Sequence, residues 1–294
     1  MPLRTLSVAT FLLLLSMPAA AGSAVAVPDI DCYSDEAEQV TRSALENAAY
    51  WGDAEVKTYN NKNYDQIRLK PTDDGWVPMI SGEGQMDFRH EVVAETVFFH
   101  QNRLEQLMSG AKAVRYLDRG YDNTIGADYA DAYFMLDLTV FYATFTQRMY
   151  KKTEGETTVL WFEQLRPEMV TPAKWASYAE KQKQIEDSLS LRWAFGSVLR
   201  LSDVYGMFVV QPGDNRSTRI TFVSKMEFGE DAGFIAQVGS QMRSVIRAGL
   251  KSGFDACVQV ATNLQKNAPA PAPKPAPAPE QSESPSAETP TSEP

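Results

Sequence analysis

Apolar and polar side chains alternate over much of the middle of this chain, which is the pattern of strands with one face turned to a core. Residues 133–150 carry apolar side chains on both alternating sets, so we expect both faces of a sheet to be covered there. The turn at 151–156 predicts a hairpin with the next strand. The predicted strands are 55–59, 64–69, 84–92, 112–119, 133–150, 157–165, 188–201, 204–211 and 218–226.

Helical periodicity appears in four segments. These are 34–51, 95–108, 171–187 and 233–262. The last is the longest, about 45 Å at 1.5 Å per residue, and its basic side chains lie off a continuous apolar stripe. Gly239, Gly249 and Gly253 each cost this helix up to about 1 kcal/mol, so we expect a close backbone approach or an empty volume beside them.

The order of strand, short helix, antiparallel strands and long terminal helix resembles the helix-grip fold of the START and polyketide-cyclase-like (SRPBCC) lipid-binding superfamily. The resemblance lies in residues 85–108, 112–211, 218–226 and 233–262. It implies an α+β domain over residues 28–266, in which a curved antiparallel sheet wraps around the long C-terminal helix. An extra N-terminal helix precedes that core.

The resemblance also implies a cavity for a hydrophobic ligand, such as a lipid, between the sheet and the terminal helix. Large or soft side chains and one glycine are the candidates for its wall, although the same side chains would fill an ordinary core. The candidates are Phe98, Trp161, Trp193, Phe195, Tyr205, Met207, Phe222, Met242, Ile246 and Gly249. The helix at 171–187, which contains Trp175, is either a lid, a transient contact with a membrane surface, or a plain surface helix.

Charge and residue counts exclude several classes of function. The 294 residues include 28 basic and 38 acidic side chains, and a pI near 4.9 argues against a nucleic-acid partner. Two histidines and two cysteines leave little for metal or thiol chemistry, and no phosphate loop or nucleophile elbow occurs. We expect no cofactor, metal or catalytic residue. Asp118, Asp122, Asp128 and Asp131 lack calcium-loop spacing and predict a solvated loop.

Two alternatives to a lipid carrier stay open. Members of the same fold class include cyclases and other enzymes, so a cyclase or hydrolase acting on a hydrophobic substrate would use polar groups of the same cavity. His90, Arg192 and Glu163 are the candidates, and an inward-facing acid and base would favour this alternative. The other alternative is an envelope protein-interaction module with a filled core and no cavity.

The two ends of the chain predict its location. Residues 1–21 have one basic residue, a short apolar run and small residues at the end, which is typical of a secretory signal peptide. Residues 267–294 hold nine of the seventeen prolines and predict a disordered Pro/Ala-rich tail. We therefore expect a periplasmic protein, or a secreted one. The tail is either a tether that reaches an envelope protein partner or a passive solubilising segment.

The two cysteines bracket nearly the whole predicted domain. In an oxidising compartment, Cys32 and Cys257 are expected to form a disulfide, which would stabilise the fold by roughly 5 kcal/mol because it closes a long loop. Two buried, unpaired thiols are the alternative.

Overall fold

The computed structural model describes residues 35–59, 64–71, 78–108, 110–138, 141–189, 198–213, 217–228 and 233–267, and for residues 36, 104, 233–242 and 267 it describes the backbone alone. The predicted signal peptide, Cys32 and the tail beyond residue 267 lie outside the described residues. Arg192, Trp193 and Phe195 also lie outside them. Expectations about these segments therefore stay predictions.

The described strands form one nine-stranded sheet in the order β1-β2-β3-β9-β8-β7-β6-β5-β4. Neighbours in this order are antiparallel, and β6 also makes a short parallel pairing with the start of β8. The bounds are β1 Glu55–Thr58, β2 Gln66–Lys70, β3 Met79–Met86, β4 Ala111–Asp122, β5 Ala127–Asp137, β6 Tyr142–Glu154, β7 Thr157–Gln164, β8 Val198–Pro212 and β9 Thr218–Phe228. The predicted hairpin is confirmed, since β6 and β7 meet through a tight turn at Gly155.

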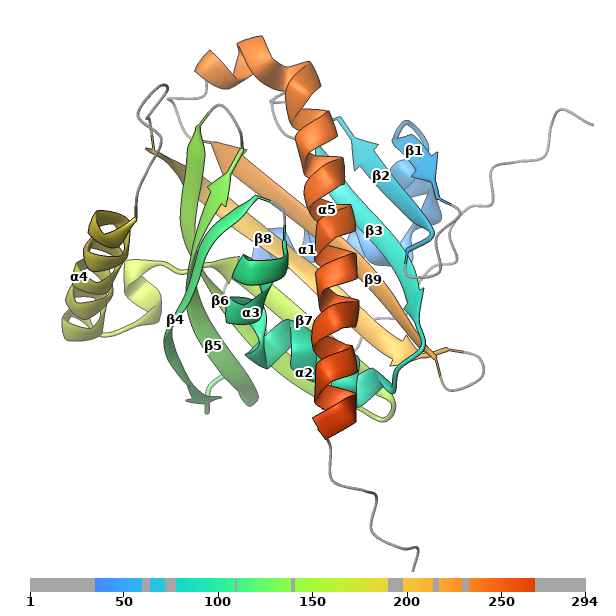
Figure 1. Ribbon diagram of the computed structural model, residues 1–294, viewed down its shortest axis with the longest axis horizontal. Helices are drawn as coiled ribbons and strands as arrows, with labels where there is room; N and C mark the ends of the chain where they lie inside the picture. The colour runs from blue at the N-terminus through green and yellow to red at the C-terminus, as the bar shows by residue number, and fades with distance from the viewer. Residues whose placement is uncertain are drawn as a thin grey trace, which may run out of the picture.

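Five α-helices and two 3₁₀ helices accompany the sheet in the described chain. They are α1 Asp35–Glu46, η2 Ala48–Trp51, α2 His90–Phe99, α3 Gln101–Leu107, η3 Pro167–Met169, α4 Pro172–Ser188 and α5 Gly233–Asn267. The sheet curves around α5, with α2 and α3 on the same side (Figure 1). The α+β class and the curved antiparallel sheet with its C-terminal helix are confirmed. None of the described helices is long and apolar enough to span a bilayer.

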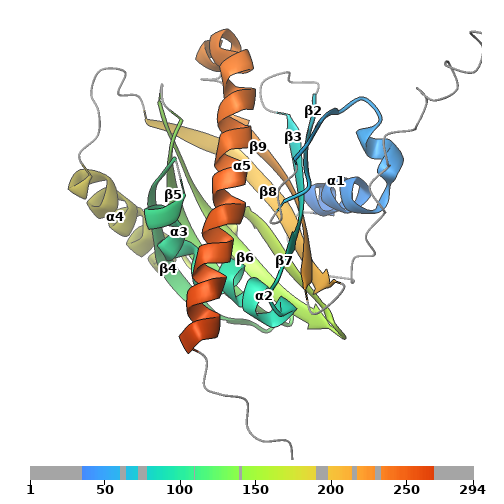
Figure 2. The same ribbon diagram turned by 45° about the vertical axis from the view of Figure 1, so that its right-hand side comes forward.

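Side chains on both faces of the sheet are buried, as the double apolar pattern predicts. The inward row faces α5 and includes Phe162 and Phe222. The outward row includes Trp161 and Val223, which pack with α1 and η2. Figure 2 shows α1 and α5 on opposite faces of the sheet. Because consecutive strand residues point to opposite faces, Trp161 and Phe162 belong to different cores.

A second outer cluster holds α4 against β4, β5 and β6. Arg148 donates two hydrogen bonds to Asp131, from Nε at 2.6 Å and from Nη2 at 2.8 Å, and both side chains are buried. The Tyr178 hydroxyl of α4 donates to Asp131 Oδ2 at 2.7 Å. The expectation that Asp131 lies in a solvated loop is therefore wrong. Its charge is accommodated because Arg148 neutralises it in a bidentate arrangement.

The segment around residue 87 differs from the prediction. The alternation predicts a strand over 84–92, but β3 ends at Met86 and α2 begins at His90. The buried side chains Val93, Ala94 and Phe98 then follow helical spacing. The strand instead extends backward to Met79, through Gly82 and Gly84, which obscure the strand signal in the sequence.

Candidate functional site

A cavity of about 270 Å³ lies between the inner face of the sheet and the helices α2, α3 and α5. The strand rows that line it are almost entirely apolar. On β6 these are Ala143, Phe145, Gln147 and Met149, and on β9 they are Ile220, Phe222, Ser224, Met226 and Phe228. The described α5 wall consists of Val245, Ile246, Gly249, Leu250, Gly253, Phe254 and Cys257.

Aromatic rings make up much of the floor formed by the central strands. The rings of Phe208 and Phe222 have centroids 4.5 Å apart, and Phe162 stacks on Phe222 at 6.2 Å. Phe162 lies over Gly206 of the neighbouring strand, where a Cβ would collide with its ring. A glycine at position 206 therefore leaves room for both the Phe162 ring and the Val223 carbonyl.

Glycines also shape the opposite wall on α5. A Cβ at Gly249 would meet no heavy atom within 4 Å, so the cavity extends up to the helix backbone there. The predicted empty volume beside this glycine is thus present. Gly253 is different, because a Cβ there would contact Met108 at 3.6 Å.

Exposure along the cavity wall indicates which end is open. Leu138, Phe228 and Val245 are partly exposed, whereas Gln101, Gln147 and Met149 are buried. In the strand register, Leu138 follows Asp137, which pairs with Tyr142 at the start of β6, whereas Gln147 and Met149 lie further along β6, opposite Ala132 and Ala130. The mouth therefore lies near Leu138 and the closed end near Met149.

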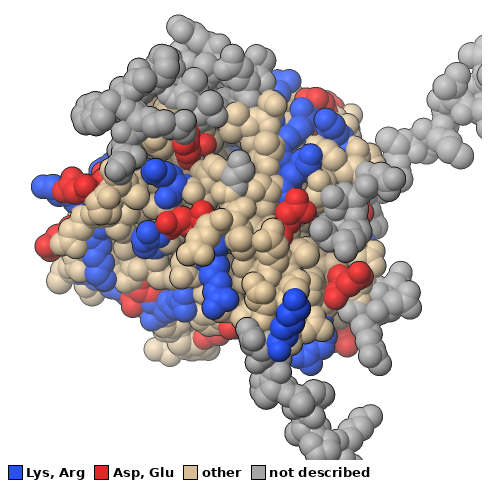
Figure 3. All heavy atoms as spheres, viewed as in Figure 1, with Lys and Arg blue, Asp and Glu red and all other residues tan. Residues whose placement is uncertain are grey.

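Ion pairs connect α5 to β1, the strand at one edge of the sheet. Glu55 of β1 pairs with Arg247 at 2.5 Å and with Arg243 at 3.9 Å. On the face of the molecule that α5 occupies, basic and acidic side chains are interspersed and not separated by sign (Figure 3). The contact between α5 and β1 is thus polar, whereas its contact with the cavity is apolar.

The structure brings only some of the predicted wall residues together. Phe222, Ile246 and Gly249 line the cavity, and Phe98 is fully buried in the core cluster next to it. Met242 lies in α5, but its side chain is not described, and Trp193 and Phe195 lie outside the described residues.

Three residues that the sequence pattern assigns to the cavity wall lie on the other face of the sheet. Trp161, Met207 and Tyr205 belong to the outer cluster under α1 and do not line the cavity. Their neighbours Phe162, Val204 and Phe208 line it instead. The pattern could not decide between them, because both members of each adjacent pair are large and apolar and strand alternation fixes only relative sides.

The polar candidates for catalysis lie elsewhere. His90 is the first residue of α2, with Nδ1 3.6 Å from Glu91, and it is not part of the cavity wall. Glu163 faces the outer cluster, where Trp161 Nε1 donates to it at 3.3 Å. Arg192 lies outside the described residues. Among the described wall residues, Asp137 is the one carboxylate, and no histidine, lysine or arginine joins it.

Cys257 lies on the α5 wall with a free and buried thiol. Burial raises the pKa of this thiol to about 12, so it is protonated at neutral pH. The pairing with Cys32 stays a prediction, because Cys32 is not described.

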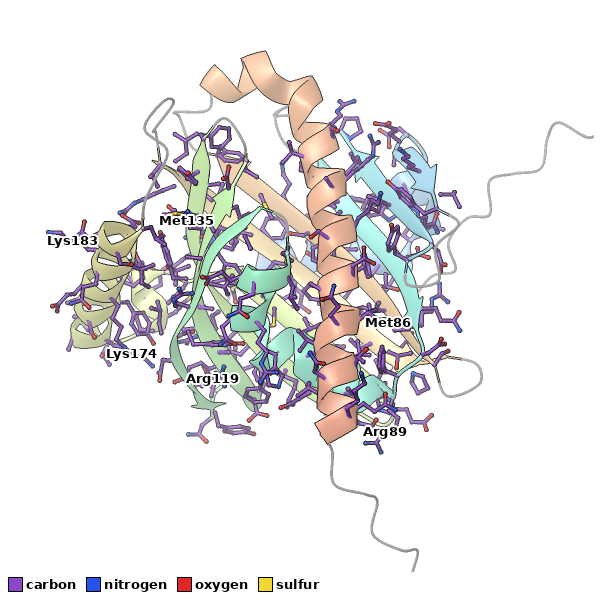
Figure 4. The ribbon with its side chains drawn as sticks, viewed as in Figure 1. Met86, Arg89, Arg119, Met135, Lys174 and Lys183 are labelled. Carbon is purple, nitrogen blue, oxygen red and sulfur yellow. The ribbon has the colours of Figure 1, made fainter. Side chains whose placement is uncertain are left out.

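The helix α4 does not cover the cavity, which contradicts the lid hypothesis. It packs on the outer face of the sheet, where Gln182 Nε2 donates to Thr146 at 2.6 Å. Figure 4 shows Lys174 extending from α4 on the side of the strands, where it donates to Tyr129 at 3.1 Å, and Lys183 extending from the far side. The apolar side of α4 is thus used for packing.

Comparison with known proteins identifies the fold. No family model matches this sequence, and no curated protein matches it either. The structure of human STARD10 is similar, with a TM-score of 0.52 and 14% identity over 83% of this chain and 85% of that chain. A STAR-related lipid transfer protein fragment from Xanthomonas axonopodis has a TM-score of 0.43 and 12% identity, over 69% of this chain and 98% of that one. The corresponding values for the Zhui aromatase/cyclase from Streptomyces sp. R1128 are 0.43 and 11%, over 64% and 94%.

The similarity to STARD10 shows that the chain has the START-like helix-grip fold. The resemblance of the element order to the START and polyketide-cyclase-like superfamily is thereby confirmed at the level of the fold.

Proposed function

We propose that this protein binds a hydrophobic ligand, such as a lipid, in the cavity between the sheet and α5. The observation that carries the proposal is the nearly all-apolar cavity of about 270 Å³, which reaches the bare backbone of Gly249. Apolar surface removed from water contributes roughly 25 cal/mol per Å², so a hydrophobic molecule that fills this cavity has a substantial driving force for binding.

The described wall supports binding over catalysis. A cyclase or hydrolase needs a positioned acid and base, and neither His90 nor Glu163 reaches the cavity. A protein-interaction module with a filled core does not fit the cavity.

The predicted signal peptide and tail extend the proposal to transport. The protein would move its ligand between membranes of the envelope, with transient contact at a membrane surface. The tail would reach a protein partner or widen the range of the domain. The periplasm is the proposed compartment, and secretion is the alternative.

Mass spectrometry of organic extracts tests ligand binding. The mature protein, purified from its native envelope without detergent, should release one hydrophobic molecule in stoichiometric amount. A protein that carries nothing, and that takes up nothing from mixed lipid vesicles, would refute the proposal. Transport is tested separately, by transfer of a fluorescent lipid from donor to acceptor vesicles. Transfer at the rate without protein would refute the carrier role alone.

A further inference from the structure

The cavity contains few polar side chains, and two of them are already satisfied by the protein. The Ser224 hydroxyl donates to the Tyr205 carbonyl at 3.2 Å, and the Thr96 hydroxyl donates to the Val92 carbonyl at 2.7 Å. Apart from Asp137 near the mouth, two side-chain amides remain in the described wall, those of Gln101 and Gln147. Both are buried wall residues at the closed end.

Gln101 has an acceptor without a partner. Its Nε2 donates to Met149 Sδ at 3.1 Å, but its Oε1 is buried and makes no hydrogen bond. A buried acceptor left without a donor is unfavourable, and such groups are rare in folded proteins. Since Gln101 belongs to the cavity wall, a donor that enters the cavity would satisfy this oxygen.

The backbone fixes the position of Gln101. Its N–H donates to the Tyr116 hydroxyl at 3.0 Å, and that hydroxyl donates to the Phe98 carbonyl at 2.9 Å. Burial raises the pKa of Tyr116 to about 12, so the hydroxyl keeps the proton that it donates. The junction of α2 and α3 is thus held in place beneath the Gln101 side chain.

Gln147 adds a second amide at the same end. It lies two residues before Met149 on the same face of β6, about 7 Å along the strand. Its side chain makes no hydrogen bond to another described residue. Gln101 contacts Met149, so the two amides flank one methionine.

The charges of the wall indicate what kind of polar group fits. The described wall has no cation, so a carboxylate or phosphate at the closed end would be buried without a counterion. Asp137 lies near the mouth, five residues along β5 from the position opposite Gln147, about 17 Å away. An uncharged group that both donates and accepts, namely a hydroxyl, suits the two amides.

We propose that the ligand is an uncharged lipid with a hydroxyl group, bound with that hydroxyl at Gln101 and Gln147 and its hydrocarbon extending toward Leu138, Phe228 and Val245. This inference rests on the proposed function. The hydroxyl donates to Gln101 Oε1 and accepts from the Gln147 amide. The cavity volume of about 270 Å³ lies just below the range of about 300–1,000 Å³ that is usual for small-molecule sites, which favours a single chain or a compact ring system over a two-chain lipid.

Three probes with a ten-carbon chain test the chemistry of the closed end. Decan-1-ol donates and accepts, 1-methoxydecane only accepts, and decanoate is charged. Their affinities are measured by displacement of Nile red from the purified protein. We expect decan-1-ol to bind about tenfold more tightly than 1-methoxydecane, and decanoate to bind least tightly.

The variant Gln101→Leu should remove the preference for the alcohol, so that decan-1-ol and 1-methoxydecane bind it with similar affinity. It should not lower the melting temperature, because it removes an unsatisfied buried acceptor. Gln106→Leu is the matched control, since Gln106 lies on the exposed side of the same helix, and it should keep the preference.

The outcomes separate this inference from the proposed function. Equal affinity for alcohol and ether, tighter binding of decanoate, or an unchanged preference in Gln101→Leu would overturn the hydroxyl site while hydrophobic binding stands. Failure of all three probes to displace Nile red, or failure of Nile red to bind, would overturn both.

Discussion

Phe254 of α5 rests directly on the backbone of Gly82 in β3, with its Cε2 3.0 Å from the position that a Cβ of residue 82 would occupy. The ring also lies near Tyr64, at a centroid distance of 6.0 Å. Because this side chain is almost fully buried, the contact sets how closely the long helix approaches the sheet beside the cavity.

A side chain at position 82 should therefore push the helix away. We expect Gly82→Val to lower the free energy of unfolding by about 1–3 kcal/mol, the usual cost of overpacking. Combining it with Phe254→Leu should recover part of the loss, so that the two changes are coupled by at least about 0.5 kcal/mol. Urea unfolding of both single variants and the double variant measures this coupling, and strictly additive effects would contradict the contact.

Gly249→Leu should fill the cavity without harming the helix. Leucine has a higher helix propensity than glycine by about 0.8 kcal/mol, and the side chain enters open space. We expect the melting temperature to be unchanged or higher, and the amount of co-purified ligand in organic extracts to fall at least tenfold. The matched control is Ala248→Leu, which adds the same side chain on the exposed side of α5. Unchanged ligand uptake in Gly249→Leu would mean that the ligand binds elsewhere.

Loss of one partner of the buried ion pair between Asp131 and Arg148 should lower the free energy of unfolding far more than loss of one partner of a surface pair. Asp131→Asn leaves the buried Arg148 cation without its counterion, and we expect a loss of about 3–5 kcal/mol in urea unfolding. Tyr178→Phe removes one hydrogen bond to the same carboxylate and should cost about 1–3 kcal/mol. Asp187→Asn, on the exposed side of α4, is the control. If Asp131→Asn were as mild as this control, the pair would not be closed to water.

The buried thiol of Cys257 should make the reduced protein less stable at alkaline pH. Burial raises the pKa of the thiol to about 12, compared with about 8.5 in an unfolded chain, so the folded state holds the proton more tightly. Stability is therefore fully present below about pH 8.5 and falls as the pH rises toward 12. Relative to Cys257→Ala, we expect a loss of about 2 kcal/mol between pH 7 and pH 10, measured by urea unfolding under reducing conditions. Parallel pH profiles for the two proteins would contradict this pKa.

The raised pKa of the Cys257 thiol also affects how the predicted disulfide with Cys32 can be tested. Cys257 resists alkylation in the folded protein in either case, as a disulfide or as a buried, protonated thiol. Labelling of the native protein therefore does not distinguish the two. Maleimide labelling in urea without a reductant distinguishes the two cases. Paired cysteines take up no label, and two free thiols take up two.

The order of the helices and strands could be predicted from the sequence, because hydrophobic residues recur in most of them with the period of a helix or of a strand. The hairpin of β6 and β7 is an example, and so is α4, which begins where Thr171 and Pro172 predict it. The predicted position of β3, 84–92, lies too late in the sequence, because Gly82 and Gly84 interrupt the apolar pattern of the true strand, Met79–Met86. Gly82 is explained by the contact with Phe254 of α5, which follows it by about 170 residues in the sequence.

The cavity wall was harder to predict than the sheet. Strand alternation shows that Trp161 and Phe162 lie on opposite sides, but only the packing of α1 shows which side is outer. In the same way, the burial of Asp131 depends on Arg148, a partner on the next strand. Gln101 could have been noticed as a polar residue among apolar helical positions, although its missing hydrogen bond is visible only in three dimensions.

The packing of the sheet on both faces has a mechanical consequence. Close-packed interiors resist deformation, and α1 and α4 pack against the outer face of the strands, so the aromatic floor of the cavity is the rigid part of its wall. If the proposed ligand enters and leaves this cavity, the accompanying change in volume would be taken up by the helical wall formed by α2, α3 and α5.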